Sequence, residues 1–278
     1  MLRAARRPHR LHPSTTLGAW VASLAIAATA ASVAPPAAAA GEPVVEKLQH
    51  GEVNWTDKVI IASGSGAPDL KLPNVAAIRL AAERAAEMTA QRNVLEALKG
   101  VRLRETVLGD KVTTTAQTSG ALRGCKRVDT RYFSDYGVDV VLRCPLDGVL
   151  STIVAPPADF KAAEATGEKL YSGLVIDATG LGHKPALYPR VLDADGGELY
   201  GQSTVKPALL QKSGAVAYYG SVDAAKKAQD RVGASPLVVV ASAVSSNDIK
   251  LSKDDVAKLR AAHLGFLAEG RVAVVVSP

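Results

Sequence analysis

The chain has 278 residues, with 33 Lys or Arg and 27 Asp or Glu, so its formal net charge is +6. The first forty residues hold four arginines and no acid, which leaves 29 basic against 27 acidic residues, or +2, in the remainder. That balance gives no electrostatic case for nucleic acid or anionic lipid as the main partner. We expect no membrane span in the mature chain, because no segment after the first forty residues is sufficiently apolar.

Residues 1–40 are predicted to be a signal peptide. Arg3, Arg6, Arg7 and Arg10 precede the apolar run 21–34, and small residues at 35–40 offer cleavage points. The run is short for a membrane span, although an uncleaved anchor is the alternative interpretation. The mature chain is therefore expected to start near Gly41 and to be exported. Because no cysteine lies near the cleavage region, there is no acceptor for a lipid.

The first predicted domain, 41–152, contains a strand at 58–63 and a long amphipathic helix at 74–99. Asn74 is suited to cap the start of the helix, and Gly100 to end it. The expected buried stripe consists of Val75, Ile78, Ala82, Ala85, Met88, Leu95 and Leu98. The opposite face carries the charged residues Arg79, Glu83, Arg84, Glu87 and Arg92. This face is interpreted as solvated, with a partner-binding surface as the alternative.

A strand at 101–108, a Thr-rich short helix within 109–124 and a hairpin at 125–144 complete this domain. With the turn centred between Asp135 and Tyr136, Cys125 is displaced by two residues from Cys144 on the same face. Such diagonal neighbours are slightly too far apart to be bridged, and a bulge near Gly124 would bring them together. The predicted disulfide between Cys125 and Cys144 competes with two buried free thiols.

A Pro/Ala-rich linker is predicted at 153–169, and a second domain at 170–278. Strands are expected at 170–180, 215–221, 235–247 and 271–278, and a hairpin turn around 195–197. Helical segments are expected at 205–214, 222–233 and 252–270. The predicted fold class is α+β: two small domains, each with a largely antiparallel or mixed sheet packed by helices, after a signal peptide.

The glycine-rich stretch after the first strand of the second domain contains Gly180, Gly182, His183 and Lys184. It lacks the Gly-Lys-Ser/Thr end of a phosphate loop, and Pro185 stands where a dinucleotide fingerprint needs its third glycine. Tight turns are favoured over a phosphate cradle. His183 is interpreted by default as a surface histidine, although it is the histidine most worth mutating.

Other sites of chemistry are weakly indicated. Asp177, Asp193 and Asp195 do not complete a calcium loop, the histidines are not at metal spacing, and no Gly-x-Ser-x-Gly occurs. No catalytic residue, metal ligand or cofactor is therefore predicted.

Residues 61–149 resemble a known family pattern. A Gly-rich lead-in precedes an alanine-rich helix ending in R-N-x-L-E, and a strand, a G-x-x-x-G and a hairpin follow. This pattern resembles the twenty-kilodalton lipoprotein family of bacterial envelopes and the N-terminal part of flagellar assembly protein T. Residues 170–278 look similar to the second domain of longer relatives, for which no activity is assigned. The chain departs from the lipoproteins in lacking the lipid-acceptor cysteine.

The resemblance implies a non-enzymatic protein in the periplasm of a Gram-negative-type bacterium, soluble or peripherally attached to the outer membrane. Its implied partners are envelope proteins, the flagellar basal body or copies of itself. One alternative is a small-ligand or glycan-binding protein that uses the 180–184 loop. Another is a hydrolase whose site is assembled from distant residues.

Overall fold

The computed structural model describes residues 41–104, 106–108, 119–120, 122–147, 159–161 and 166–277. They belong to one compact unit, Ala38–Pro278, separate from Met1–Ala37. The signal peptide, most of the Thr-rich helix and most of the linker lie outside the described residues, and the domain boundaries remain predictions. The described residues contain helices and two sheets, which confirms the α+β fold class.

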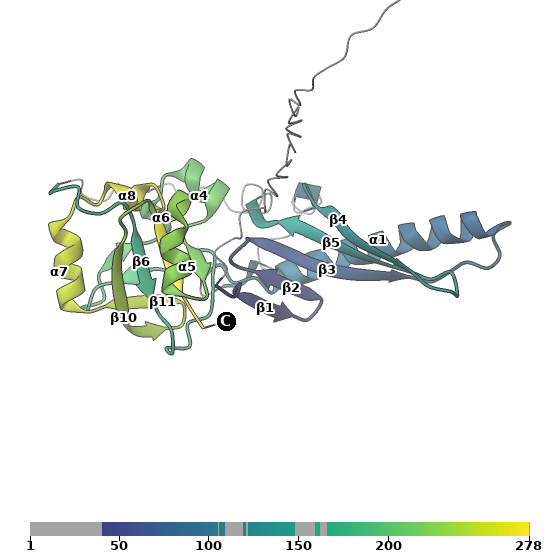
Figure 1. Cartoon of the computed structure of the whole chain (residues 1–278), viewed down its shortest axis with the longest axis horizontal. Coiled ribbons are helices and arrows are strands. Elements are labelled where there is room, and N and C mark those ends of the chain that lie inside the picture. Colours follow the sequence, from purple (N-terminus) through teal and green to yellow (C-terminus); the bar gives the residue numbers. More distant parts are fainter. Residues whose placement is uncertain are drawn as a thin grey trace, which may run out of the picture. The chain divides into compact units, whose positions relative to one another are not determined.

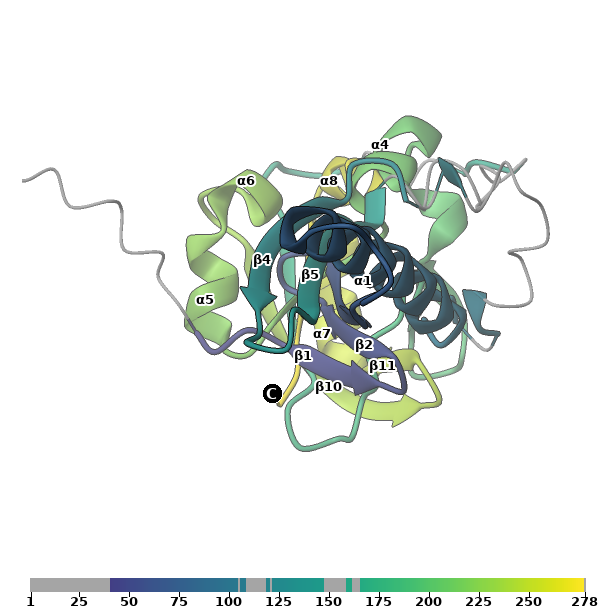
Figure 2. The ribbon, with the colours of Figure 1, turned by 90° about the vertical axis from the view of Figure 1, so that its right-hand side faces the viewer.

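The N-terminal sheet has five strands in the order β1-β2-β3-β5-β4, and every neighbouring pair is antiparallel. The strands are β1 (Val45–Leu48), β2 (Gly51–Asn54), β3 (Val59–Gly66), β4 (Lys126–Tyr132) and β5 (Val138–Pro145). Helix α1 (Val75–Lys99) runs beside β4 and β5 in two views (Figures 1 and 2). Strands β1 and β2 were not predicted. The prediction of a strand at 101–108 is wrong, because in the described part of that range a single isolated bridge joins Arg102 and Val107.

Helix α1 begins and ends where the sequence predicts. The Asn74 side chain accepts the N–H of Ala77 at 2.8 Å, and the Gly100 N–H bonds back to the last turn. The buried seam follows a spacing of four: Ile78, Ala82, Ala86, Ala90, Val94 and Leu98. The predicted stripe was wrong at three positions, Val75, Ala85 and Met88, which are exposed. A row of residues four apart is inclined to the helix axis, and this row lies along the sheet.

The middle of the seam, Ala82, Ala86 and Ala90, consists of small residues because the helix approaches the sheet closely there. A Cβ atom placed on Gly66 would collide with the backbone of Ala82, and one on Gly64 with the backbone of Ala90. Glycine in β3 and alanine in α1 are therefore matched partners, and larger side chains would force the two elements apart.

The C-terminal sheet has seven strands in the order β8-β7-β11-β10-β6-β12-β9. These are β6 (Leu174–Asp177), β7 (Val191–Leu192), β8 (Glu198–Tyr200), β9 (Ala217–Tyr219), β10 (Leu237–Ser245), β11 (Asp248–Leu251) and β12 (Val272–Val275). Strands β10, β6, β12 and β9 form a parallel core. The pairs β10–β11 and β7–β8 are antiparallel, so the sheet is mixed, as expected. Strand β11 was not predicted.

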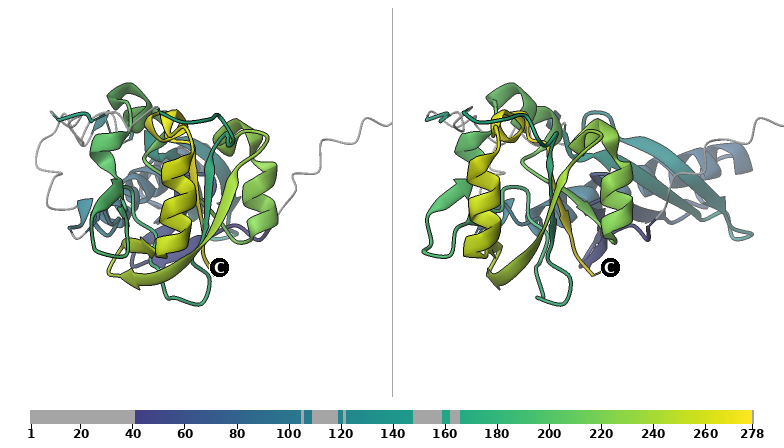
Figure 3. Two further views of the ribbon diagram at one scale, coloured as in Figure 1. Left: turned by 90° about the vertical axis from the view of Figure 1, so that its left-hand side faces the viewer. Right: turned by 60° about the vertical axis from the view of Figure 1, so that its left-hand side comes forward.

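Helices cover both faces of this sheet, and Figure 3 shows α5 and α7 on opposite sides of its strands. The segments are η2 (Gln202–Thr204), α4 (Pro207–Ser213), α5 (Val222–Lys227), α6 (Gln229–Val232), α7 (Lys253–Ala261) and α8 (Gly265–Ala268). Val175, Ala273 and Val275 form a small core with α5 and α6. The single helix expected at 252–270 is interrupted, because Ala262 is extended and pairs with Glu168.

Candidate functional site

The glycine loop begins where β6 ends. The Asp177 carboxylate accepts the N–H of Thr179 at 3.0 Å and its hydroxyl at 2.7 Å. Gly180 and Gly182 have φ angles of 75° and 67°, a conformation that favours glycine. The next regular element is β7 rather than a helix, so these residues do not form the amide cradle that opens a phosphate-binding helix. The geometry agrees with the interpretation as tight turns.

His183 is buried, which corrects the expectation of a surface histidine. Only 7% of the residue is exposed, and its ring stacks on Tyr218 with 5.9 Å between centroids. Lys184, Gly180 and Gly182 are exposed, so the four predicted loop residues do not converge on one pocket. The sequence offered no sign of this burial, because His183 is surrounded by loop residues without periodicity.

The hydrogen bonds of Tyr218 fix the tautomer of His183. The Tyr218 hydroxyl donates its one proton to the carbonyl of Ala186 at 2.8 Å and accepts the Ala186 N–H at 3.0 Å. The Nε2 atom of His183 lies 3.4 Å from the same oxygen and must therefore be the donor. Its Nδ1 atom then carries the lone pair, and it has no hydrogen-bond partner among the described residues. Burial, assisted by the charge of Arg102, lowers the pKa of His183 to about 4.

The His183 cluster, defined here as His183, Tyr218 and Trp55, joins the loop to the first half of the chain. The Trp55 and Tyr218 rings meet edge to face at 5.7 Å. The Trp55 indole donates to Glu46 at 3.0 Å, and Arg102 donates to both oxygens of that carboxylate at 2.6 Å. The cavity beside Trp55 and Tyr218 has about 10 Å³, which is room for no more than one water molecule. The cluster is therefore a packing junction, not a ligand pocket.

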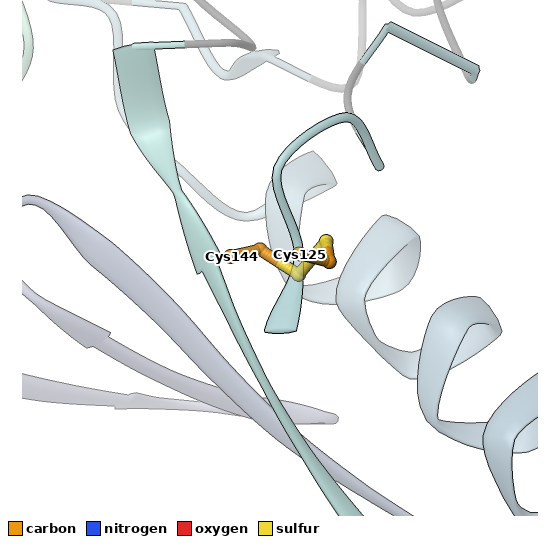
Figure 4. Close-up of a disulfide and its surroundings, with 2 residues drawn as sticks. All are labelled: Cys125 and Cys144. Atoms are coloured by element: carbon orange, nitrogen blue, oxygen red, sulfur yellow. A yellow bond between two sulfur atoms is a disulfide. The ribbon is translucent and has the colours of Figure 1, made fainter. Parts of the chain in front are cut away.

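Cys125 and Cys144 form a disulfide between the segment preceding β4 and strand β5 (Figure 4). Tyr132 pairs with Val138, and the register shifts at Val128, between Arg127 and Asp129. This shift places Lys126 opposite Arg143, and the Cα atoms of Cys125 and Cys144 come within 4.0 Å. The predicted disulfide is present, but the bulge lies at Val128 rather than near Gly124. Bulges in edge strands leave little trace in a single sequence.

The five charged residues predicted to form one face of α1 lie on two different rows. Arg79, Glu83 and Glu87 form a flank directed at the β4–β5 hairpin. Arg127 donates to Glu83 and, at 2.7 Å, to Glu87, and the Tyr132 hydroxyl donates to Glu83 at 2.9 Å. Arg127 and then Tyr132, as hydrogen-bond donors, lower the pKa of Glu83. The like-charged pair Glu83 and Glu87 is thus held together by one guanidinium.

The flank also packs on the hairpin turn. The Arg79 guanidinium lies over the Tyr136 ring, 5.7 Å from its centroid. Because the flank contacts the hairpin, Arg79, Glu83 and Glu87 are not a freely solvated face. Arg84 and Arg92 alone of the predicted set lie in the outward row.

The outward row of α1, called here the outer stripe, consists of Leu80, Arg84, Met88 and Arg92. All four are exposed, with 49% for Leu80 and 66% for Met88. The stripe lies two residues, or about 200°, from the buried seam, so it faces away from the sheet. Within the described ranges, neither arginine has an ion-pair or hydrogen-bond partner. Apolar and cationic side chains therefore alternate along a rigid, unshielded row.

Metal and membrane sites were considered over the same residues. The described part of the chain contains no group of three or more His, Cys, Asp or Glu side chains arranged to hold a metal ion. Nor does any helix within it combine the length and apolar character required to cross a bilayer.

A family model described as the second domain of Treponema pallidum Tp0624 matches residues 173–278. The match starts just before β6 and includes the whole C-terminal sheet. It covers less than half of the chain, so the similarity concerns the second half alone. No curated protein matches the chain.

Proposed function

We propose that this chain is an exported, non-enzymatic cell-envelope protein that acts through protein–protein contacts made by the outer stripe of α1. The observation that carries the proposal is the pattern of Leu80, Arg84, Met88 and Arg92. Large apolar side chains that a globular core would use alternate along this outward row with two cations that have no partner among the described residues. The stripe suits a partner surface that presents apolar and acidic groups.

A partner is better accommodated by side-chain contacts with the outer stripe than by the addition of its own strand to the edge of the N-terminal sheet. Strand β4 is an edge strand, but Lys126, Arg127 and Arg131 line it and a bulge interrupts it at Val128. Charged residues and bulges are the features by which edge strands resist pairing with another chain. The hairpin instead supports α1 through the contacts to its flank.

A periplasmic location is supported by the disulfide, because such bonds persist in oxidising compartments. The resemblance of residues 61–149 to envelope lipoproteins and to flagellar assembly protein T suggests the partners: other envelope proteins, the flagellar basal body, or a second copy. The ligand-binding and hydrolase alternatives have less support. The candidate loop residues diverge, and the strongly shifted His183 lies in a packing junction instead of a cleft.

Photo-crosslinking from α1 in intact cells tests the proposal. A photoreactive amino acid replaces Met88 in one strain and, as the matched control, Val240 in another; Val240 is 64% exposed on β10. We expect a discrete adduct from position 88, containing a basal-body or outer-membrane protein, that weakens when Arg84 and Arg92 are changed to Gln. Equal labelling from both positions, or no adduct at position 88, would contradict the proposal.

A further inference from the structure

A second feature, independent of the outer stripe, is a cationic pocket of about 490 Å³. It is formed by the β2–β3 turn, α4, α6 and the segment between α8 and β12. Five cations line it: Lys58, Lys206, Lys212, Arg231 and Arg271. Two acids also line it, Asp230 and Glu269, so the lining carries a net charge of +3. A concave site lined by uncompensated charge of one sign concentrates ligands of the opposite sign.

The inner wall is held rigidly by Arg231 and Lys58. The Arg231 guanidinium donates to the carbonyls of Ser213, Gly214, Ala215 and Val272, the third at 2.8 Å. The Lys58 ammonium also donates to the carbonyl of Ser213. These bonds satisfy carbonyls at the C-terminal end of α4, where cations are favourable. They also fix the Arg231 charge and the Lys58 amino group behind the pocket without an acid among these partners to neutralise either.

Lys58 occupies an unusual backbone position. Its φ angle is 55°, in the left-handed region where glycine or asparagine is the usual residue. A lysine there carries a conformational cost, and the backbone alone would be better served by a different residue. The Lys58 side chain is engaged at this position, because its ammonium donates to the Ser213 carbonyl at the wall of the pocket.

The rim supplies donors that have no partner. Lys206 and Lys212, at the two ends of α4, are exposed and form no ion pair with any residue that the structure describes. Arg271 differs, because it pairs with Glu269 at 2.7 Å. The free donors are therefore ammonium groups, whereas both guanidinium groups are already engaged.

We propose that this pocket binds a phosphate-type oxyanion carrying two or three negative charges, held by Lys206 and Lys212 in front of Lys58 and Arg231. The charge of the ligand matches the net charge of the lining. Ammonium groups act as point charges that suit a tetrahedral oxyanion, and the planar fork that selects a carboxylate is occupied at Arg231. The phosphate can belong to a free small molecule or to a lipid headgroup, because both present the same group.

Binding should also take up a proton. Burial and the neighbouring Arg231 lower the pKa of Lys58 to about 7, with Asp230 acting in the opposite direction. Lys206 and Lys212 of α4, together with Glu269 and Arg271, are the other charged groups facing the pocket. A bound anion stabilises the charged ammonium, so it raises the pKa of Lys58, and affinity increases as pH falls from about 9 to about 6.

Calorimetric titration of the full mature chain with inorganic pyrophosphate is the first test. We expect binding in the range of about 0.1 to 1 mM that weakens about tenfold in the double variant Lys206→Gln, Lys212→Gln. The control is Lys226→Gln, Lys227→Gln, which removes the same charge from the exposed face of α5. The control variant should bind as the parent does.

The pH dependence of binding is measured with sulfate, because sulfate does not gain or lose a proton between about pH 9 and about pH 6. The parent should take up a proton on binding, and Lys58→Asn, which suits the left-handed backbone, should not. Sedimentation with phosphatidylcholine vesicles containing phosphatidic acid separates the two sources. Vesicle binding that requires Lys206 and Lys212 assigns the phosphate to lipid, and pyrophosphate binding without vesicle binding assigns it to a small molecule.

Three results would overturn the proposal. One is no heat of binding up to about 10 mM pyrophosphate together with no vesicle binding. Another is equal weakening in the α5 control, which would mean that overall charge alone is sensed. The third is unchanged affinity in the Lys206 and Lys212 variant. Failure of the crosslinking experiment on α1 would leave these results unaffected, since the two sites share no residue.

Discussion

Helix α1 meets the N-terminal sheet through alanine against glycine, whereas the C-terminal sheet is packed through valine, leucine and tyrosine. The fully buried large side chains include Tyr200, Tyr218, Leu174 and Ile176 of the second half. In the first half, Leu80 and Met88 of α1 are exposed. Alanine and glycine bury little apolar area, so the contact between α1 and β3 depends on close fit, whereas the C-terminal sheet depends on buried area.

The two halves also differ in where their polar interactions lie: at the surface in the first half and in the interior in the second. The flank of α1 is held by the surface guanidinium of Arg127, while inside the second half His183 donates to the Tyr218 hydroxyl, which itself donates to the carbonyl of Ala186. The first half should therefore be sensitive to added atoms and the second to added charge. The four predictions that follow use this contrast, in order of decreasing effect.

Gly66→Val should cause the largest loss of stability. The new Cβ would collide with the backbone of Ala82, which cannot rotate away as a side chain can. We expect the free energy of unfolding to fall by about 4 kcal/mol, above the usual cost of overpacking. Urea denaturation followed by circular dichroism measures it.

The matched control is Ser65→Val, at the exposed neighbouring position of β3. This change should alter stability by less than about 0.5 kcal/mol. If the two substitutions cost the same, close fit between α1 and β3 is not what holds the first half together.

Replacing both Cys125 and Cys144 with Ser should cost about 3 kcal/mol in the chain-entropy picture, because the bond closes a loop with a sequence separation of 19. Comparing urea midpoints of the parent with and without reductant provides the measurement. The Ser variant should be indifferent to reductant. A reductant effect that persists in the Ser variant would show that the parent's response has another origin.

Acid should destabilise the second half through His183. Its pKa is about 4 in the folded chain and about 6.5 when exposed, so the unfolded state binds the proton more tightly. The stability that neutral His183 contributes is complete above about pH 6.5. It is lost as the pH falls to about 4, at roughly 1.4 kcal/mol for each pH unit. Over the interval between these two pKa values the total is about 3 kcal/mol, measured as the pH dependence of the urea midpoint.

His183→Gln keeps a donor for Tyr218 and removes the titration, so the loss between these pH values should flatten. His50→Gln, at an exposed histidine between β1 and β2, is the control and should retain the parent's pH dependence. A parent whose stability is constant over this range would show that His183 is hydrated or paired in solution.

The sequence predicted those features of the fold that depend on neighbouring residues and failed for those that depend on packing between elements. Asn74 and Gly100 bound α1 correctly because caps are local chemistry. The predicted seam was wrong at Val75, Ala85 and Met88 because it followed spacings of three as well as four, whereas the buried row keeps to four and meets the glycines of β3 at alanine. Strands β1, β2 and β11 were missed because each has only four residues, too few for a clear alternation of apolar and polar side chains, although they form local hairpins with their neighbours.

The sites were less predictable than the fold. The disulfide was expected from two cysteines and export, but its geometry depends on a bulge at Val128. His183 was assigned to the surface, because its burial depends on Tyr218, 35 residues away. The cationic pocket was not foreseen at all. It combines Lys58 with residues more than a hundred positions later, and no local pattern joins them.

Arg127→Ala should have the smallest effect, and it sharpens the contrast between surface and buried polar groups. The side chain is 36% exposed, so its two ion pairs are partly screened, and we expect a loss of about 0.5 to 1 kcal/mol. Salt should weaken the parent by a similar amount, because it screens the attraction between Arg127 and the two glutamates, and should slightly stabilise the variant, because it screens the repulsion between Glu83 and Glu87. Removal of Arg127 also leaves Glu83 and Glu87 facing each other, so most of the loss should disappear in the triple variant with both glutamates changed to Gln. A loss of several kcal/mol that salt does not affect would place Arg127 among the buried groups, and the two halves would then rely on the same kind of interaction.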